Sequence, residues 1–212
     1  MNLQGHLRRY MELVARADRL FDTVAHSHGN LMACKAGCDD CCHVYFRVTL
    51  IEAFVINQAF KQNVSDGFRS RAISRAEQVE PLFRQAEQLI ALADEKGQAI
   101  ETASRIKIRC PLNEDHACIL YEYRPITCRL YGTPQKMAGK VVSCPRNGFL
   151  AGTKYTTIDI DDIQKRLSRY SRDLLVDLVG IDPQPPGPLY CISDVIRTTF
   201  DKNYFLSLSE SL

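Results

Sequence analysis

Long apolar segments are missing from this sequence. No run of about 18 consecutive apolar residues occurs, which is the length that a membrane-spanning helix needs. The first residues, MNLQGHLRRYMELVARADRLF, are interrupted by His, Arg and Glu where a signal peptide would have an unbroken apolar stretch. We therefore expect a cytoplasmic protein that neither spans nor binds a membrane.

The sequence also has no marked excess of charge of one sign. Lys and Arg together number 27, Asp and Glu 25, and the formal net charge is only +2. Nucleic-acid-binding proteins usually carry a basic excess, so we expect no nucleic-acid partner here. With 212 residues, of which 45% are hydrophobic and 25% charged, the chain can bury a globular core without the help of disulfides.

Signatures of common enzyme classes are absent as well. The sequence has no Gly-rich phosphate loop, no internal repeat and no strand–helix alternation of the kind that a parallel sheet needs. Paired carboxylates and a Ser–His–Asp set do not stand out either. The catalytic residues are therefore unknown from the sequence, and whether the protein is an enzyme stays open.

What the sequence does contain is helical periodicity. Residues 3–27 place apolar side chains at spacings of three and four, and the same pattern returns over residues 163–178 until Gly180 ends it. Thr49 and Glu52 have the spacing of a capping box and predict the start of another helix.

The remaining elements are predicted from shorter patterns. VYFRV, residues 44–48, has the composition of a short strand. Residues 65–95 are helical in pattern, but Pro81 predicts a break into two helices because proline lacks an N–H and clashes with the preceding turn. A last helix is expected around SDVIRTTF, residues 193–200. The expected fold class is mainly α: a helical domain with a loop-rich cysteine metal centre and one or two short strands.

These patterns divide the chain into three parts. We expect an N-terminal helix packing on the core in residues 1–30, a cysteine-cluster domain in 31–150 and a C-terminal helical extension in 151–212. Within the second part, residues 108–150 are rich in Pro, Gly, Asn and Asp, with only short apolar runs. Such loops are expected to lack a core of their own and to be organised by a bound metal.

Nine cysteines in a reducing compartment indicate metal ligands or redox chemistry more than a disulfide framework. In CKAGCDDCCH, residues 34–43, the spacing of Cys34, Cys38 and Cys41 lets loop cysteines turn their sulfurs toward one metal. Buried thiols of a packed core are the alternative, but KAG and DD are polar turn residues with nothing to pack. Radical-SAM enzymes share the C-x3-C-x2-C spacing, yet their barrel needs more strands than this sequence offers.

A second set of cysteines lies in CPLNEDHACILYEYRPITCRLYG, residues 110–132, and in the following VVSCP. Together with CKAGCDDCC, these segments resemble the YkgJ-like cysteine-cluster family, which is described as a zinc- or iron-chelating domain. The resemblance covers roughly residues 31–150 and departs from the usual short form by three residues, rather than two, between Cys34 and Cys38. The family pattern is matched by Cys34, Cys38, Cys41, Cys42, Cys110, Pro111, Cys118, Tyr121, Arg124, Pro125, Cys128 and Arg129.

The resemblance implies metal chelation, and similar proteins are often called iron–sulfur oxidoreductases. We expect eight metal ligands: Cys34, Cys38, Cys41, Cys42, Cys110, Cys118, Cys128 and Cys144. Eight thiols suit two four-thiolate sites, or one cluster with four supporting thiols, and both arrangements stay open. Cys191 lies outside the pattern, and we expect it to be a buried free thiol.

Three further residues, Arg124, Arg129 and Tyr121, are expected to bind the cofactor. Arg124 and Arg129 can donate hydrogen bonds to sulfur, or else form a salt bridge to Glu122 or another acid. Tyr121, like Tyr131, is expected to pack over the site and exclude water.

The histidines are expected to have other roles. His43 and His116 flank cysteines, but exposed loop histidines beside a metal site are commoner than ligands. His6, His26 and His28 are expected at the surface or at helix ends.

Three functions follow from these residues. The preferred one is an iron–sulfur protein with an electron-transfer or oxidoreductase role and an unidentified redox or protein partner, since an all-thiolate donor set suits iron–sulfur chemistry. A zinc-structured interaction module would use the same cysteines. A protein that passes iron or zinc onward is the third.

Overall fold

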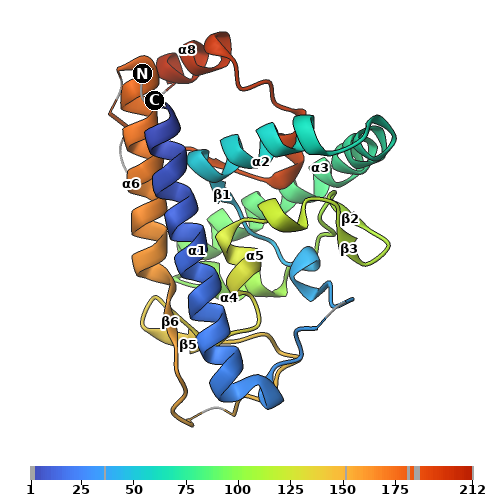
Figure 1. The fold of residues 1–212 in the computed structure, drawn as a ribbon, viewed down its shortest axis with the longest axis vertical. Helices are drawn as coiled ribbons and strands as arrows, with labels where there is room; N and C mark the ends of the chain where they lie inside the picture. Colours follow the sequence, from blue (N-terminus) through green and yellow to red (C-terminus); the bar gives the residue numbers. More distant parts are fainter. Residues whose placement is uncertain (1–2, 36, 151, 181, 184–186, 212) are drawn as a thin grey trace.

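The computed structural model describes residues 3–35, 37–150, 152–180, 182–183 and 187–211. The fold within these residues is mainly helical, as expected (Figure 1). Its α-helices are α1 Leu3–His28, α2 Leu50–Asn63, α3 Asp66–Asp94, α4 Ala99–Arg105, α5 Ile126–Leu130, α6 Ile160–Val179, α7 Ile192–Arg197 and α8 Lys202–Ser211. Short 3-10 turns add η1 Gly29–Leu31, η2 Asp40–His43 and η3 Tyr121–Tyr123.

The strands are two or three residues long and form three small sheets. They are β1 Val48–Thr49, β2 Asn113–Glu114, β3 Ala117–Cys118, β4 Gln135–Met137, β5 Lys140–Val142, β6 Ile158–Asp159 and β7 Leu189–Tyr190. β1 pairs antiparallel with β7, which joins two segments far apart in the sequence, and β2 pairs with β3 in a hairpin. β4 pairs antiparallel with β5 and parallel with β6.

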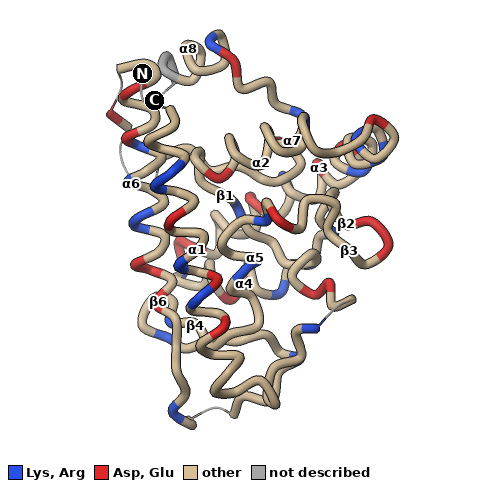
Figure 2. Tube along the Cα trace, in the orientation of Figure 1, with Lys and Arg blue, Asp and Glu red and all other residues tan. Residues whose placement is uncertain are grey.

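The main core lies where α1, α2 and α6 meet. α1 and α6 are amphipathic and run side by side along one edge of the molecule (Figure 1), each burying one apolar stripe. Lys and Arg alternate with Asp and Glu along the rest of these two helices (Figure 2). α2 is buried around most of its circumference, and Leu50, Ile51 and Ile56 are fully covered. Burying a side chain of this size contributes about 1.5–3 kcal/mol to folding.

Two helix ends confirm the sequence-based prediction. The Thr49 and Glu52 capping box is present at the start of α2, and Gly180 ends α6 in the left-handed conformation with φ 73°. Glu52 does more than cap its own helix. Its buried carboxylate accepts hydrogen bonds from the Thr49 N–H at 3.1 Å and hydroxyl at 3.0 Å, and from the Ile126 N–H at 3.1 Å. This side chain therefore links the starts of α2 and α5.

The prediction of a helix break at Pro81 is wrong. α3 runs from Asp66 to Asp94 through the proline. Its first half buries Ala72 and Ala76 in the main core, while its second half buries Phe83 and Ala86 in a separate small cluster. A proline inside a helix costs about 3 kcal/mol, because one hydrogen bond is lost and the ring clashes with the preceding turn. Packing on both sides of Pro81 therefore holds the helix together.

Other expected elements differ in extent. The strand expected over residues 44–48 is reduced to an isolated bridge between Val44 and Lys107, with regular pairing only at Val48–Thr49. α4, α5 and α8 were not expected, because helices of 5 to 10 residues offer few turns of periodicity. His6, expected at the surface, is buried, and its Nε2 lies 2.7 Å from a carboxylate oxygen of Asp177.

The loops that carry the second cysteine set are anchored in the core. Leu112, Leu120, Ile126 and Leu130 belong to the same cluster of buried residues as the main helices, so this segment packs into the main core, while its organisation by a metal stays a prediction. That cluster extends from Tyr10 to Phe205 and draws on all three parts of the expected domain division, whose boundaries remain a prediction. Among the described residues, no helix is long and apolar enough to cross a membrane.

Candidate metal centre

Seven cysteines from separate segments line one pocket of about 610 Å³. They are Cys34, Cys38, Cys41, Cys42, Cys110, Cys118 and Cys128. The backbone brings the segments together: the Cys110 N–H donates to the Cys42 carbonyl at 2.6 Å, and the Ile108 N–H to the His43 carbonyl at 3.1 Å. Cys118 ends the β2–β3 hairpin, and Cys128 lies on α5. All nine cysteines lie within the described residues, and each is a free thiol.

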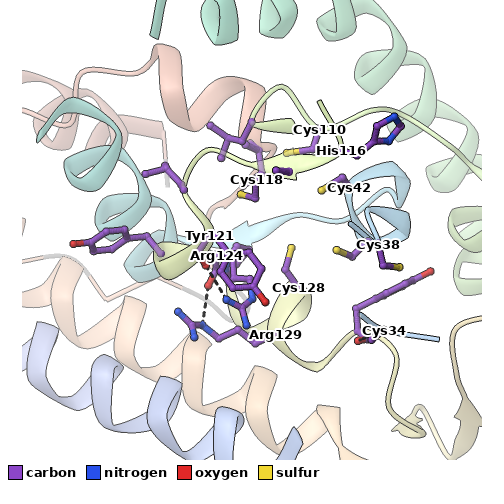
Figure 3. A pocket seen from close by; sticks show the side chains of 18 of the residues that line it. Cys34, Cys38, Cys42, Cys110, His116, Cys118, Tyr121, Arg124, Cys128 and Arg129 are labelled. Atoms are coloured by element: carbon purple, nitrogen blue, oxygen red, sulfur yellow. Dashed lines mark hydrogen bonds between the residues drawn. The ribbon is translucent and has the colours of Figure 1, made fainter. Parts of the chain in front are cut away.

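The pocket thiols form two groups. Figure 3 shows Cys42, Cys110 and Cys118 together in one part of the view and Cys34 in another, with Cys38 and Cys128 between them. The first group also includes Cys41, which is hydrogen-bonded to both Cys42 and Cys128. We call these five residues, Cys41, Cys42, Cys110, Cys118 and Cys128, the inner thiols.

The second group comprises Cys34, Cys38 and Cys144, which we call the outer thiols. Cys34 interacts electrostatically with both Cys38 and Cys144. The Cys144 thiol donates to the Asp40 carboxylate at 3.3 Å, and the Cys34 thiol to the Tyr131 carbonyl at 3.5 Å. Gly132 makes room for this group, because a Cβ there would clash with the Cys34 sulfur.

Burial and the neighbouring thiols keep the inner cysteines protonated. The hydrogen bond to Cys128 and burial raise the pKa of Cys41 to about 12, and burial raises that of Cys118 to about 11. Burial and Cys118 raise the pKa of Cys110 as well. The pKa of Cys128 is also raised, because burial and the nearby thiols outweigh its hydrogen bond with Cys41.

Cys34 and Cys144 of the outer group are held in the same state. Burial, then Cys38 and Cys144, raise the pKa of Cys34 to about 11. Burial and the hydrogen bond to Asp40 raise the pKa of Cys144. Several thiolates cannot share this pocket without a cation, and a metal ion supplies the charge that ionises a coordinating thiol.

The arginines expected near the sulfurs bind other groups. Arg129 is 7% exposed and forms an ion pair with Asp18 at 2.9 Å, and it also donates to the carbonyls of Arg124 and Glu122. Arg124 donates to the Tyr121 carbonyl and stacks on the Tyr121 ring, with 3.8 Å between the guanidinium carbon and the ring centre. Among the hydrogen bonds of the described residues, neither guanidinium donates to a sulfur.

Arg129 thus forms the salt bridge that was the alternative to a bond with sulfur, and its acid partner lies outside the adjacent turn. It is Asp18 rather than the Glu122 carboxylate, because α5 packs directly against α1. Arg124, Arg129 and Tyr121 nevertheless all line the pocket (Figure 3). Tyr121 is 59% exposed, so it lies at the mouth of the pocket and does not seal it.

The two aspartates of the first cysteine loop have different partners. Asp39 accepts from His116 Nδ1 at 2.9 Å, from Asn113 at 3.1 Å and from His43 Nε2 at 3.3 Å. Although burial acts in the opposite direction, these hydrogen bonds lower the pKa of Asp39 to about 2. Asp40 instead accepts from the Tyr131 hydroxyl at 2.8 Å and from Cys144.

Cys191 lies apart from both groups, as expected. It is 3% exposed and packs with Phe83, Ala86 and Ile108. Burial, then Glu87, raise the pKa of this thiol to about 12, which is typical of an inert buried cysteine.

The donor set fits a thiophilic metal group by its chemistry. Thiolates are the preferred ligands of zinc and iron–sulfur clusters, and eight thiols lie in or beside this pocket. Across the described residues, no three or more His, Cys, Asp or Glu side chains already stand in positions to hold one metal ion. Binding would therefore require the thiols to draw together, which the loop positions of Cys34, Cys38, Cys41 and Cys42 permit.

Several residues of the site were not singled out from the sequence. Asp18 and Asn113 carry no local signal, since their partners Arg129 and Asp39 are 111 and 74 residues away along the chain. Gly132 follows Tyr131 in an ordinary turn, and only the structure shows Cys34 against it. Asp39 and Asp40 stand next to the cysteines in the sequence, but the sequence does not distinguish their roles.

Comparison with known proteins gives no further information, because no protein-family model, curated protein or solved structure matches the chain.

Proposed function

We propose that this protein binds a metal centre through its cysteine pocket, preferably an iron–sulfur cluster with an electron-transfer or oxidoreductase role. The observation that carries the proposal is that seven cysteines, from residue 34 to residue 128, line one pocket. Free thiols are easily oxidised when they gather in this way, and metal ligation is the usual reason for such a cluster in a reducing compartment.

The surroundings of the inner thiols favour an iron–sulfur cluster. Five thiols lie together, which exceeds the four that such a cluster uses. Phe46, Leu112 and Leu120 add an apolar lining, and burial of this kind tunes a cluster's reduction potential. When bound, an iron–sulfur cluster supplies one-electron redox chemistry.

The chain's own residues would hold this group. Cys41, Cys42, Cys110, Cys118 and Cys128 are the thiols that would ligate it. Arg129 is neutralised by Asp18 and fixes the turn before α5, so it positions Cys128 and does not contact the sulfurs. Tyr121, with Arg124 stacked on it, would lie beside the bound group at the mouth of the pocket.

A zinc-structured interaction module is the second candidate. Tyr121 and Tyr123 are 59% and 37% exposed beside the pocket, and exposed aromatic side chains of this kind are enriched at protein interfaces. Zinc in closed four-thiolate sites would then fix the loops that present these tyrosines. A metal-handling protein would use the same thiols, and no contact in the described residues favours it over the other two.

Spectroscopy of the purified protein distinguishes these functions. The full chain is expressed in iron-replete cells, purified without oxygen and analysed for iron, sulfide and zinc. An iron–sulfur protein should be brown, absorb broadly in the visible and bleach with dithionite, whereas zinc has no redox chemistry. A colourless protein with stoichiometric zinc would contradict the preferred function and leave the interaction module. A protein without any metal would contradict both.

A further inference from the structure

The outer thiols are one short of a four-thiolate site. Cys34 interacts electrostatically with Cys38 and with Cys144, while Cys41, which also interacts with Cys34, is hydrogen-bonded to Cys42 and Cys128 among the inner thiols. With Cys41 counted among the inner thiols, the eight expected cysteine ligands divide five to three. A second metal site needs a ligand that is not a cysteine.

Asp40 is a carboxylate donor beside the outer thiols. Its Oδ2 lies 3.3 Å from the Cys144 sulfur and 2.8 Å from the Tyr131 hydroxyl. The carbonyl of the same Tyr131 accepts from the Cys34 thiol at 3.5 Å, so two of the three outer thiols contact Asp40 or its direct partner. Cys38 comes from the same loop, two residues before Asp40.

We infer that Asp40 is the fourth ligand of a second metal site, formed with Cys34, Cys38 and Cys144. This inference rests on the proposed metal-binding function and deepens it. Three sulfurs and one carboxylate oxygen suit a single borderline-soft divalent cation, such as Zn²⁺ or Fe²⁺, which binds both donor types. On binding, three S–H bonds are replaced by metal–sulfur bonds, three protons are released, and no electron is transferred.

The charges around Asp40 support a cation with this ligand set. Three thiolates, one carboxylate and a divalent ion would leave a net charge of −2 by simple addition. Lys107 and Arg146 lie close enough to Asp40 to interact with it electrostatically, and Arg146 also interacts with Cys34. These two cations offset the remaining charge of the loaded site.

Asp39 provides a matched control. It precedes Asp40 directly and is also partly buried, but its carboxylate is bound to His43, His116 and Asn113. Its partners on the β2–β3 hairpin lie away from the outer thiols. If an acidic side chain in this loop were needed only for folding, both aspartates would be equally sensitive to replacement.

The test is zinc titration of the full-length protein, purified metal-free and reduced, using Zn²⁺ alone as the probe. The wild type should bind about two ions, one with a shell of three sulfurs near 2.3 Å and one oxygen at about 2.0–2.2 Å by X-ray absorption. Asp40→Asn should bind about half as much zinc and lose the oxygen scatterer. Asp39→Asn should bind as much as the wild type, and circular dichroism checks that each variant is folded.

Two more variants separate ligation from a structural role. Asp40→Cys should keep full zinc content with an all-sulfur shell, because a thiolate can replace the carboxylate as ligand. Tyr131→Phe removes the hydroxyl that Asp40 binds but leaves the ligands, so it should also keep the zinc.

The outcomes distinguish this inference from the proposed function. Full zinc content and an unchanged sulfur and oxygen shell in Asp40→Asn would overturn the role of Asp40 while leaving a cysteine-bound metal. Failure of Asp40→Cys to bind more zinc than Asp40→Asn would overturn it as well. A wild type that binds no zinc, and carries no iron when purified without oxygen, would overturn both.

Discussion

Replacing Glu52 by Gln tests how the fold positions α5 and its cysteine. The Glu52 carboxylate is 2% exposed and accepts three hydrogen bonds, two from Thr49 and one from Ile126. A Gln side chain has one carbonyl oxygen and one NH₂ group. If the oxygen faces Thr49, the NH₂ group meets the buried N–H of Ile126, and two donors then oppose each other.

The size of the effect follows from this geometry. An unsatisfied buried N–H costs roughly 1–3 kcal/mol, and the Gln side chain leaves one whether or not the wild-type carboxyl group is ionised. We expect a net loss of about 2 kcal/mol. For a chain of this length, that corresponds to a fall in Tm of about 4–8 °C. Glu101→Gln is the control, because its partner Arg105 is exposed and such pairs contribute about 0.3–0.5 kcal/mol.

The pH dependence gives this prediction a second readout. Burial raises the pKa of Glu52 above its ordinary value, although hydrogen bonds from Thr49 and Ile126 act in the opposite direction. The folded state therefore binds the Glu52 proton more tightly than the unfolded state does. Its contribution to stability is complete below the unfolded pKa and decreases as pH rises through the folded pKa.

Thermal unfolding of the wild type and Glu52→Gln across this pH range is the assay. The stability advantage of the wild type should be larger at acidic pH and shrink as pH rises from the ordinary glutamate pKa. Equal stability of the two proteins at all pH values, or an advantage that grows with pH, would refute the reasoning.

Three other perturbations test the surroundings of the pocket. Gly132→Ala should lower both stability and metal content because its Cβ clashes with the Cys34 sulfur, while Gly139→Ala, also at positive φ but in open space, should only lower stability. Arg129→Lys has a single nitrogen and cannot bind Asp18 and the carbonyls of Arg124 and Glu122 at once, so it should destabilise by roughly 2 kcal/mol in urea unfolding, and an unchanged midpoint would contradict this. Metal removal should speed hydrogen exchange in η2, none of whose residues is buried, but not in α6; equal exchange in η2 with and without metal would remove the structural role.

Amphipathic helices with clear ends were predictable from the sequence. α1 and α6 each carry one apolar stripe, the Thr49–Glu52 capping box marks the start of α2, and Gly180 marks the end of α6. Pro81 misled the prediction because tertiary packing on both halves of α3 outweighs a local helix-breaking signal. α5 has only five residues, too few for a periodic pattern. Its first residue, Ile126, donates its backbone N–H to the Glu52 carboxylate, a contact that the sequence does not show.

The site was predictable in composition but not in arrangement. Spacing and resemblance singled out the cysteines that the structure brings to one pocket. Their division into inner and outer thiols depends on the backbone hydrogen bonds between η2 and the segment before the β2–β3 hairpin. No local sequence pattern encodes this pairing. The same is true of Arg129, whose acid partner comes from α1 and not from the adjacent turn.

The most direct test of the central claim compares the metal content of Cys128→Ser and Cys191→Ser. Both cysteines are largely covered, but Cys128 lines the pocket and Cys191 packs in a separate apolar cluster. Serine replaces a soft thiolate with a hard, mostly protonated hydroxyl. We predict that Cys128→Ser, expressed and purified without oxygen, binds clearly less metal than the wild type because the inner thiols lose a ligand, while Cys191→Ser retains the full content. Equal metal content in the two variants would contradict the assignment of this pocket as the metal centre.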